Sequence, residues 1–187
     1  QALGNKLTGT TELIINDIPK IDTCTVNGLL AVAFDKTTAF PYDAEKLTFS
    51  NYCYIQEPVL VRKLKNLSSA TELNNYLSNV GQGDYLLLFS SGNAGYETWH
   101  PNVKAAVKDI GASSFIDSLK NGEPYILLGR KGAGEGNAIS EVFVRPCPPP
   151  CPLSRSGIPG DLQVISLDTT LLGSLYQGTI TSTVIGP

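Results

Sequence analysis

Residues 83–89 read GDYLLLF and contain the clearest β-strand of the chain. A helix is predicted to start at Pro101, because a proline in the first turn lacks only an amide hydrogen that the helix does not use. The helix is predicted to stop at Gly111, which can adopt the left-handed conformation, and a strand follows at residues 125–128. Strand, helix and strand in this order predict a right-handed parallel crossover and therefore an α/β fold.

The flanking sequence predicts further strands and one more helix. Residues 28–34, GLLAVAF, are apolar throughout, which is typical of a strand buried on both faces. Ser69 and Glu72 match a capping box at a helix start, and Gly81 is expected to end that helix. Shorter elements are expected at 13–15, 114–119, 139–144, 162–167 and 178–185. The expectation is a compact domain in which mixed β-sheets pack with two to three helices.

The turn GRKGAGEG at residues 129–136 raises the question of a phosphate-binding loop. A Walker loop needs a hydroxyl residue directly after its lysine, and Lys131 is followed by Gly132. The dinucleotide fingerprint needs a third glycine where this chain has Asn137. Both motifs fail on spacing, so the sequence predicts no nucleotide cofactor.

The sequence contains few residues that could form a catalytic site. His100 is the only histidine, so any Ser-His-Asp or Cys-His arrangement has to use it. Its place directly before a helix start predicts that its ring caps the helix or packs. Asp35, Asp84 and Asp109 could act as paired carboxylates, but each also fits a turn or an exposed helix face. The sequence therefore predicts a non-enzymatic chain without a cofactor or metal.

Four cysteines indicate an oxidising compartment. Their number is even and none lies in a C-x-x-C pair, which favours the disulfides Cys24–Cys53 and Cys147–Cys151. A zinc site is the alternative, although such sites normally combine two close pairs and only Cys147 and Cys151 are close. An extracellular or cell-surface location is expected.

Composition and length limit the classes of partner. The 187 residues carry a net charge of −3, which predicts neither a nucleic acid nor an anionic membrane as partner. No run approaches the roughly 20 apolar residues of a membrane span. One domain is expected at residues 1–145 and a Pro/Cys-rich linker at 146–160; residues 161–187 form a strand pair that completes this domain or starts the next. The chain begins at Gln1 and lacks methionine, so we interpret it as a piece of a larger protein.

Five motifs in order carry a resemblance to a known family. They are NGLLAVAFD at 27–35, LNNYL at 73–77, GDYLLLF at 83–89, VKDIG at 107–111 and YILLGRKG at 125–132. Together they resemble the interleukin-like EMT inducer domain, also called the PANDER-like or GG domain. The resemblance implies a compact, non-enzymatic α/β module in which the turn at 129–132 is a feature of the fold. Members occur as secreted signalling proteins and as domains of extracellular or glycan-handling proteins, including the carbohydrate-binding stem of a glycosyltransferase.

The chain also departs from the animal pattern of this family. Tyr125 replaces a tryptophan, and the tail CPPPC at 147–151 has no counterpart. The sequences of the predicted strands look more similar to those in modules of large bacterial surface proteins associated with type IX secretion.

The leading hypothesis is an accessory binding or interaction module of a larger secreted or surface protein. Its expected ligand is a glycan or an extracellular protein, and its oligomeric state stays open. The candidate ligand-binding residues are Trp99, Arg130 and Lys131, although a sole tryptophan such as Trp99 is more often packed structure than a sugar platform. The alternatives are a stand-alone secreted signalling protein and a hydrolase fragment that uses His100 or a carboxylate pair.

Overall fold

The centre of the fold is a five-stranded sheet in the order β5-β4-β6-β7-β8. The computed structural model describes residues 2–3, 13–15, 18–21, 27–42, 62–64, 67–121, 123–143, 164–173 and 177–180. The sheet strands are β4 (Gly28–Phe34), β5 (Arg62–Leu64), β6 (Tyr85–Ser91), β7 (Tyr125–Arg130) and β8 (Ser140–Phe143). All of their pairings are antiparallel.

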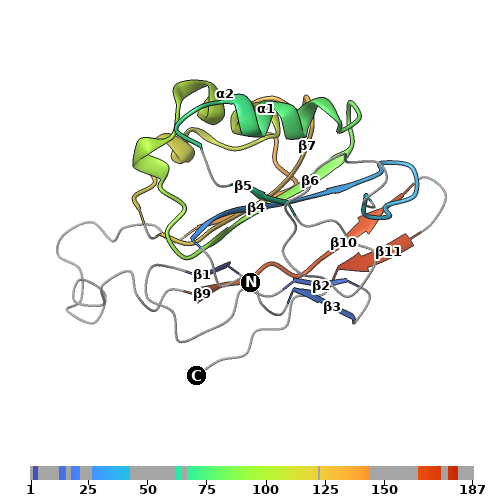
Figure 1. Cartoon of the computed structure of the whole chain (residues 1–187). Helices are drawn as coiled ribbons and strands as arrows, with labels where there is room; N and C mark the ends of the chain where they lie inside the picture. Colours follow the sequence, from blue (N-terminus) through green and yellow to red (C-terminus); the bar gives the residue numbers. More distant parts are fainter. Residues whose placement is uncertain are drawn as a thin grey trace.

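Helices cover one face of this sheet and short strand pairs lie on the other (Figure 1). The helical layer contains α1 (Thr71–Ser78), η1 (Tyr96–Thr98), α2 (Pro101–Asp109) and η2 (Ser114–Asp117). The opposite layer pairs β1 (Ala2–Leu3) with β9 (Val164–Ile165), β2 (Leu13–Ile15) with β3 (Ile18–Ile21), and β10 (Thr169–Leu172) with β11 (Gln177–Ile180). The α/β class is therefore confirmed.

Side chains of the sheet alternate between two hydrophobic clusters, because successive residues of a strand point to opposite faces. In β4, Leu29 and Ala31 join the cluster under the helices, while Leu30 and Val32 join the cluster on the other face. Every residue of β4 is buried, which confirms the prediction for residues 28–34. Helix side chains complete the first cluster; they include Leu73, Tyr76, Val103, Val107 and Ile110.

The predicted parallel crossover is wrong, because β6 and β7 are antiparallel neighbours. Helix α2 starts near the Ser91 end of β6 and ends against β7, where the amide of Arg130 donates to the carbonyl of Ile110 at 3.0 Å. Residues 112–124 then return to the start of β7, where Tyr125 lies. The connection crosses the sheet twice and so returns to the end of the sheet at which β6 finishes. Strand β7 therefore runs in the opposite direction to β6.

The two helix starts differ in how well the sequence predicted them. Helix α2 begins at Pro101, and the Nδ1 atom of His100 accepts a hydrogen bond from the amide of Asn102 at 3.2 Å. The prediction that this ring caps the helix is confirmed. The capping box at Ser69 is wrong: the helix starts at Thr71, and the Ser69 hydroxyl accepts from the Thr71 amide at 3.4 Å instead of from the amide that a capping box uses.

The structure also tests the predicted short elements. The turn of helix expected at 114–119 is η2, and the strand expected at 139–144 is β8. Strand β10 was not predicted; its Leu171 is 2% exposed and belongs to the hydrophobic cluster on the face of the sheet opposite the helices. All four cysteines and the linker 146–160 lie outside the described residues. No helix of the described part is long and apolar enough to cross a membrane.

Candidate functional site

The glycine-rich turn at residues 129–136, which begins with the last two residues of β7, packs around the C-terminal end of α2. Amide groups of the turn donate to the last carbonyls of that helix and to those just beyond it: Gly134 to Asp109 at 3.1 Å, Ala138 to Gly111 at 2.9 Å and Gly136 to Ala112 at 2.9 Å. A helix C-terminus carries partial negative charge, which repels an anion. The turn therefore directs these amides at carbonyls of the fold, and it lies at a helix end whose partial charge disfavours a phosphate.

Gly129 starts this turn at a point where the backbones touch. A Cβ atom at this position would lie 2.0 Å from the carbonyl oxygen of Ile110. No side chain fits there, so this glycine allows α2 to dock against the end of β7.

Lys131 makes its hydrogen bonds at the C-terminal end of α1. Its Nζ atom donates to the carbonyl oxygens of Leu77 and Val80, both at 2.7 Å, at the C-terminus of α1. A cation at this position satisfies carbonyls that the helix leaves unpaired and complements the helix dipole. Lys131, predicted as a ligand-binding residue, thus has its charge engaged inside the fold.

Arg130 makes its contacts with Tyr85 of β6. Its Nη2 atom donates to the Tyr85 hydroxyl at 2.9 Å, and the guanidinium carbon lies 4.7 Å from the centre of the tyrosine ring. The same hydroxyl donates to the carbonyl of Leu172 at 2.9 Å, which ties β10 to the sheet. The Arg130 side chain remains exposed.

The three predicted ligand-binding residues do not form one site. Arg130 pairs with Tyr85 at the start of β6, whereas Trp99 lines a groove together with Gly28, which pairs with Ser91 at the end of β6. Trp99 is 6% exposed. Its Nε1 atom donates to the carbonyl of Ala94 at 2.8 Å and its ring centre lies 5.0 Å from that of Tyr96, so the indole offers no open stacking face.

The groove at the Ser91 end of β6 is open and has a volume of about 390 Å³. Polar side chains line it together with apolar ones, and none of the lining residues that the structure describes is charged. The polar residues are Asn27, Ser68, Asn93 and Thr98, and the larger apolar ones are Leu64, Leu67 and Trp99. Hydrogen-bonding groups beside apolar walls are the usual composition of a small-ligand site.

Two asparagines shape this groove. The Oδ1 atom of Asn27, directly before β4, accepts a hydrogen bond from the amide of Asn93 at 2.9 Å. The Oδ1 atom of Asn93 accepts in turn from the amide of Gly95 at 2.9 Å, where the chain has a φ of 68°. Neither asparagine was predicted as a site residue, because an asparagine next to a glycine is also an ordinary turn residue.

The buried carboxylate of Asp84 lies at the other end of β6. It accepts hydrogen bonds from the hydroxyl of Tyr42 and, at 3.0 Å, from the amide of Lys36. Burial, followed by the hydrogen bond to Asp84, raises the pKa of Tyr42 to about 12. Asp35 instead folds a turn, where it accepts from the amide of Thr37 at 2.8 Å.

Other ionisable groups join the helical layer to the sheet. The carboxylate of Glu141 accepts from the Tyr125 hydroxyl at 2.6 Å and from the amide of Ser113. Burial, and then the bond to Glu141, raise the pKa of Tyr125.

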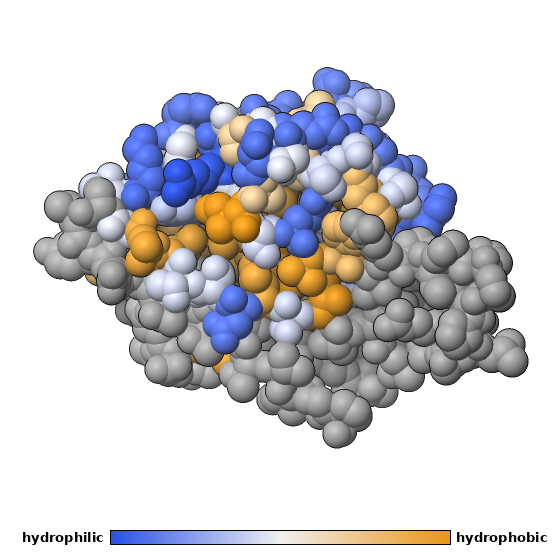
Figure 2. Space-filling model, turned by 180° about the vertical axis from the view of Figure 1, so that it is seen from behind, coloured by the Kyte–Doolittle hydropathy of each residue, from blue (hydrophilic) through white to orange (hydrophobic). Residues whose placement is uncertain are grey.

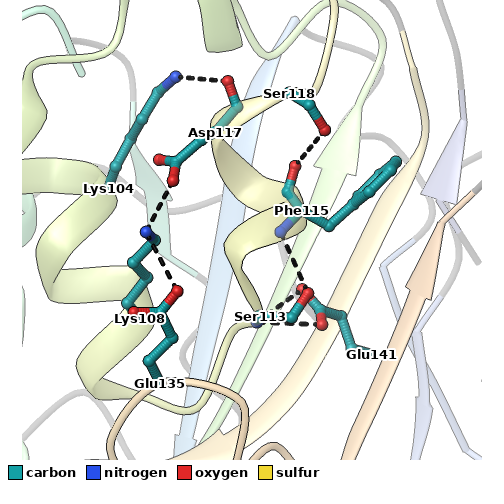
Figure 3. Close-up of polar contacts among 8 residues, drawn as sticks. All are labelled: Lys104, Lys108, Ser113, Phe115, Asp117, Ser118, Glu135 and Glu141. Carbon is teal, nitrogen blue, oxygen red and sulfur yellow. Dashed lines mark hydrogen bonds and ion pairs between the residues drawn. The ribbon is translucent and has the colours of Figure 1, made fainter.

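Figure 3 shows the Glu141–Ser113 contact beside a second cluster, in which Lys108 lies between Asp117 and Glu135 at 2.7 and 3.2 Å. These contacts hold η2 and the glycine-rich turn against α2. No cluster of three metal-ligating side chains occurs among the residues that the structure describes.

No protein-family model matches the sequence, and no curated protein sequence matches it either. Membership of the interleukin-like EMT inducer family therefore stays a prediction from the order of the motifs.

Proposed function

We propose that the chain is a non-catalytic extracellular binding module of a larger secreted or surface protein, and that it binds a glycan in the groove at the Ser91 end of β6. One observation carries the proposal: the described residues that line the groove are all uncharged, and four of them have hydrogen-bonding side chains. Most of the surface of a sugar consists of hydroxyls and apolar C–H patches. Amide and hydroxyl groups beside leucine side chains are complementary to such a surface.

The contacts of the ionisable residues support the non-catalytic part of the proposal. A general base must reach a substrate proton within hydrogen-bond distance. Asp84 and Glu141 accept hydrogen bonds from tyrosine hydroxyls and backbone amides. His100 caps α2 with its Nδ1 atom. Each of these groups has a role in holding the fold.

A protein ligand is the second candidate, and a different surface favours it. Figure 2 shows apolar side chains gathered in the middle of one face, below the hydrophilic helical layer. At the edge strand β8, the rings of Phe115 and Phe143 stack with their centres 3.7 Å apart, and Ile139 is 45% exposed. Exposed apolar surface of this kind is typical of protein contacts.

A glycan array with two variants tests the proposal. Ser68→Arg places a long charged side chain at an exposed position of the groove, and Asn74→Arg adds the same side chain to an exposed position of α1. We expect the unmodified chain and Asn74→Arg to bind the same glycans and Ser68→Arg to lose them. Binding that survives Ser68→Arg, or no glycan binding by the unmodified chain, would contradict the proposal, and protein binding unaffected by Ser68→Arg would support the second candidate.

A further inference from the structure

The hydrogen bonds of the two groove asparagines determine which way their side-chain amides face. A backbone amide can only donate, so the atom opposite it must be an oxygen. The amides of Asn93 and Gly95 therefore fix the Oδ1 atoms of Asn27 and Asn93 against the backbone. Both NH₂ groups point away from these contacts, and neither donates to another residue of the described chain.

Two other donors that line the groove are already engaged. The Trp99 indole donates to Ala94, and the hydroxyl of Thr98 donates to the carbonyl of Gly95 at 2.8 Å. The NH₂ groups of Asn27 and Asn93 thus give the groove uncommitted donors without a charge. A donor that loses water on binding needs an acceptor from the ligand, because a desolvated donor without a partner weakens binding.

From this geometry we infer that the groove selects sugars that carry an sp² oxygen, either an acyl carbonyl or a carboxylate, and that Asn27 and Asn93 determine this specificity. The inference rests on the glycan-binding function proposed above. An sp² oxygen accepts two hydrogen bonds in the plane of its group and carries no proton of its own. A hydroxyl also accepts, but its proton then needs a further acceptor. The site therefore discriminates in favour of ligands that present an oxygen without a proton to these two NH₂ groups.

The variants Asn27→Asp and Asn93→Asp test the inference. Aspartate has nearly the same shape and keeps an oxygen opposite the backbone amide, but it replaces the NH₂ donor with a second acceptor. Asn121→Asp is the matched control. Its Oδ1 atom accepts from the amide of Glu97 at 3.1 Å, and it lies outside the groove. The control thus reproduces both the change in charge and the kind of contact that is retained.

Binding is measured on oligosaccharides that carry N-acetyl, O-acetyl or uronate groups and on unsubstituted hexose oligomers of the same length. We expect the unmodified chain to prefer the substituted sugars by about tenfold, and each groove variant to lose about tenfold in affinity, as a lost hydrogen bond predicts. Asn121→Asp should bind like the unmodified chain. Uronate binding should fall further than acyl binding in the groove variants, because the new carboxylate repels the ligand, and this difference separates the two sources of the sp² oxygen.

Three results would overturn the inference. One is equal binding of substituted and unsubstituted sugars. Another is unchanged affinity in both Asn27→Asp and Asn93→Asp, provided that both variants unfold at the same temperature as the unmodified chain. The third is a gain in affinity on Asn→Asp replacement, which would mean that the ligand donates to the groove. If Ser68→Arg still abolishes binding in any of these cases, only the specificity is wrong; absence of all glycan binding removes the proposed function as well.

Discussion

The two ends of strand β6 differ in how their polar groups are used. At the Tyr85 end, the cation of Lys131 and the amides of the glycine-rich turn bond to carbonyls of α1 and α2. At the Ser91 end, Asn27 and Asn93 use their oxygens for the backbone and keep their NH₂ groups available. The end with glycines and cations resembles a binding loop in sequence, yet its groups hold the fold. The end with unused donors is the better candidate for a ligand site.

The largest effect that separates the two ends is expected from Gly129→Ala. The new methyl group would overlap the carbonyl of Ile110, which is backbone and cannot rotate away. We expect a loss of about 3 kcal/mol in the free energy of unfolding, in the upper part of the range for overpacking. Urea denaturation measures this loss.

Gly136→Ala serves as the control in the same turn. A Cβ atom there meets nothing within 4 Å, although the φ of 78° is unfavourable for alanine. We expect a loss of about 1 kcal/mol, from the backbone alone. Equal losses for Gly129→Ala and Gly136→Ala would show that the contact with α2 has no special weight.

Tyr42→Phe should destabilise the chain by about 2 kcal/mol at neutral pH, because Asp84 loses one of its donors. The effect depends on pH. The pKa of Tyr42 is raised from 10.0 to about 12 in the folded chain, so its contribution is complete below about pH 10 and is lost as the pH rises to about 12.

The stability difference between the unmodified chain and Tyr42→Phe should therefore shrink between pH 10 and 12. Burial also raises the pKa of Tyr125, so both proteins lose stability over this range and only their difference reports on Tyr42. Thermal unfolding at several pH values gives this difference. A constant difference would exclude the proposed titration.

Lys131→Met tests whether the predicted ligand cation belongs to the fold. Methionine keeps part of the apolar stem but removes the donor to Leu77 and Val80. We expect a loss of about 1 kcal/mol in stability and unchanged glycan affinity, measured by denaturation and by titration calorimetry. Lys104→Met is the control, since the Nζ atom of Lys104 makes only a 3.5 Å contact with a carbonyl. A loss of glycan affinity at unchanged stability would indicate that Lys131 contacts the ligand.

The smallest effect is expected at the groove end, from His100→Ala. Loss of the cap on Asn102 should lower stability by about 0.5–1 kcal/mol, while His100→Asn should restore it, because asparagine is a good N-cap residue. Thermal unfolding of both variants checks this. A hydrolytic activity that disappears in both variants would instead support the hydrolase alternative.

The sequence predicted the central strands and the start of α2, but it did not predict how these elements meet. Apolar runs predicted β4, β6 and β7, and the pair His100 and Pro101 predicted the start of α2, because these signals are local. The direction of β7 is not a local property. It follows from a connection that crosses the sheet twice, and a count of residues between two strands cannot show this.

Site residues were harder to predict for a related reason. The partners of Lys131 lie 51 and 54 residues away along the chain, so its place in the sequence shows only a cation beside glycines. Asn27 and Asn93 are 66 residues apart and meet because β4 and β6 are neighbours. Trp99 was predicted either as a sugar platform or as packed structure, and its 6% exposure fits the second interpretation.

The contacts of the glycine-rich turn have a consequence for solvent exchange. A surface loop with four glycines would normally exchange its amide hydrogens with deuterium within seconds. The amides of Gly134, Gly136 and Ala138 donate to carbonyls at the end of α2 and just beyond it, so they can exchange only when that end of the helix opens. Their protection factors should follow those of the last turn of α2, and this loop would then report on the opening of a helix to which it does not belong.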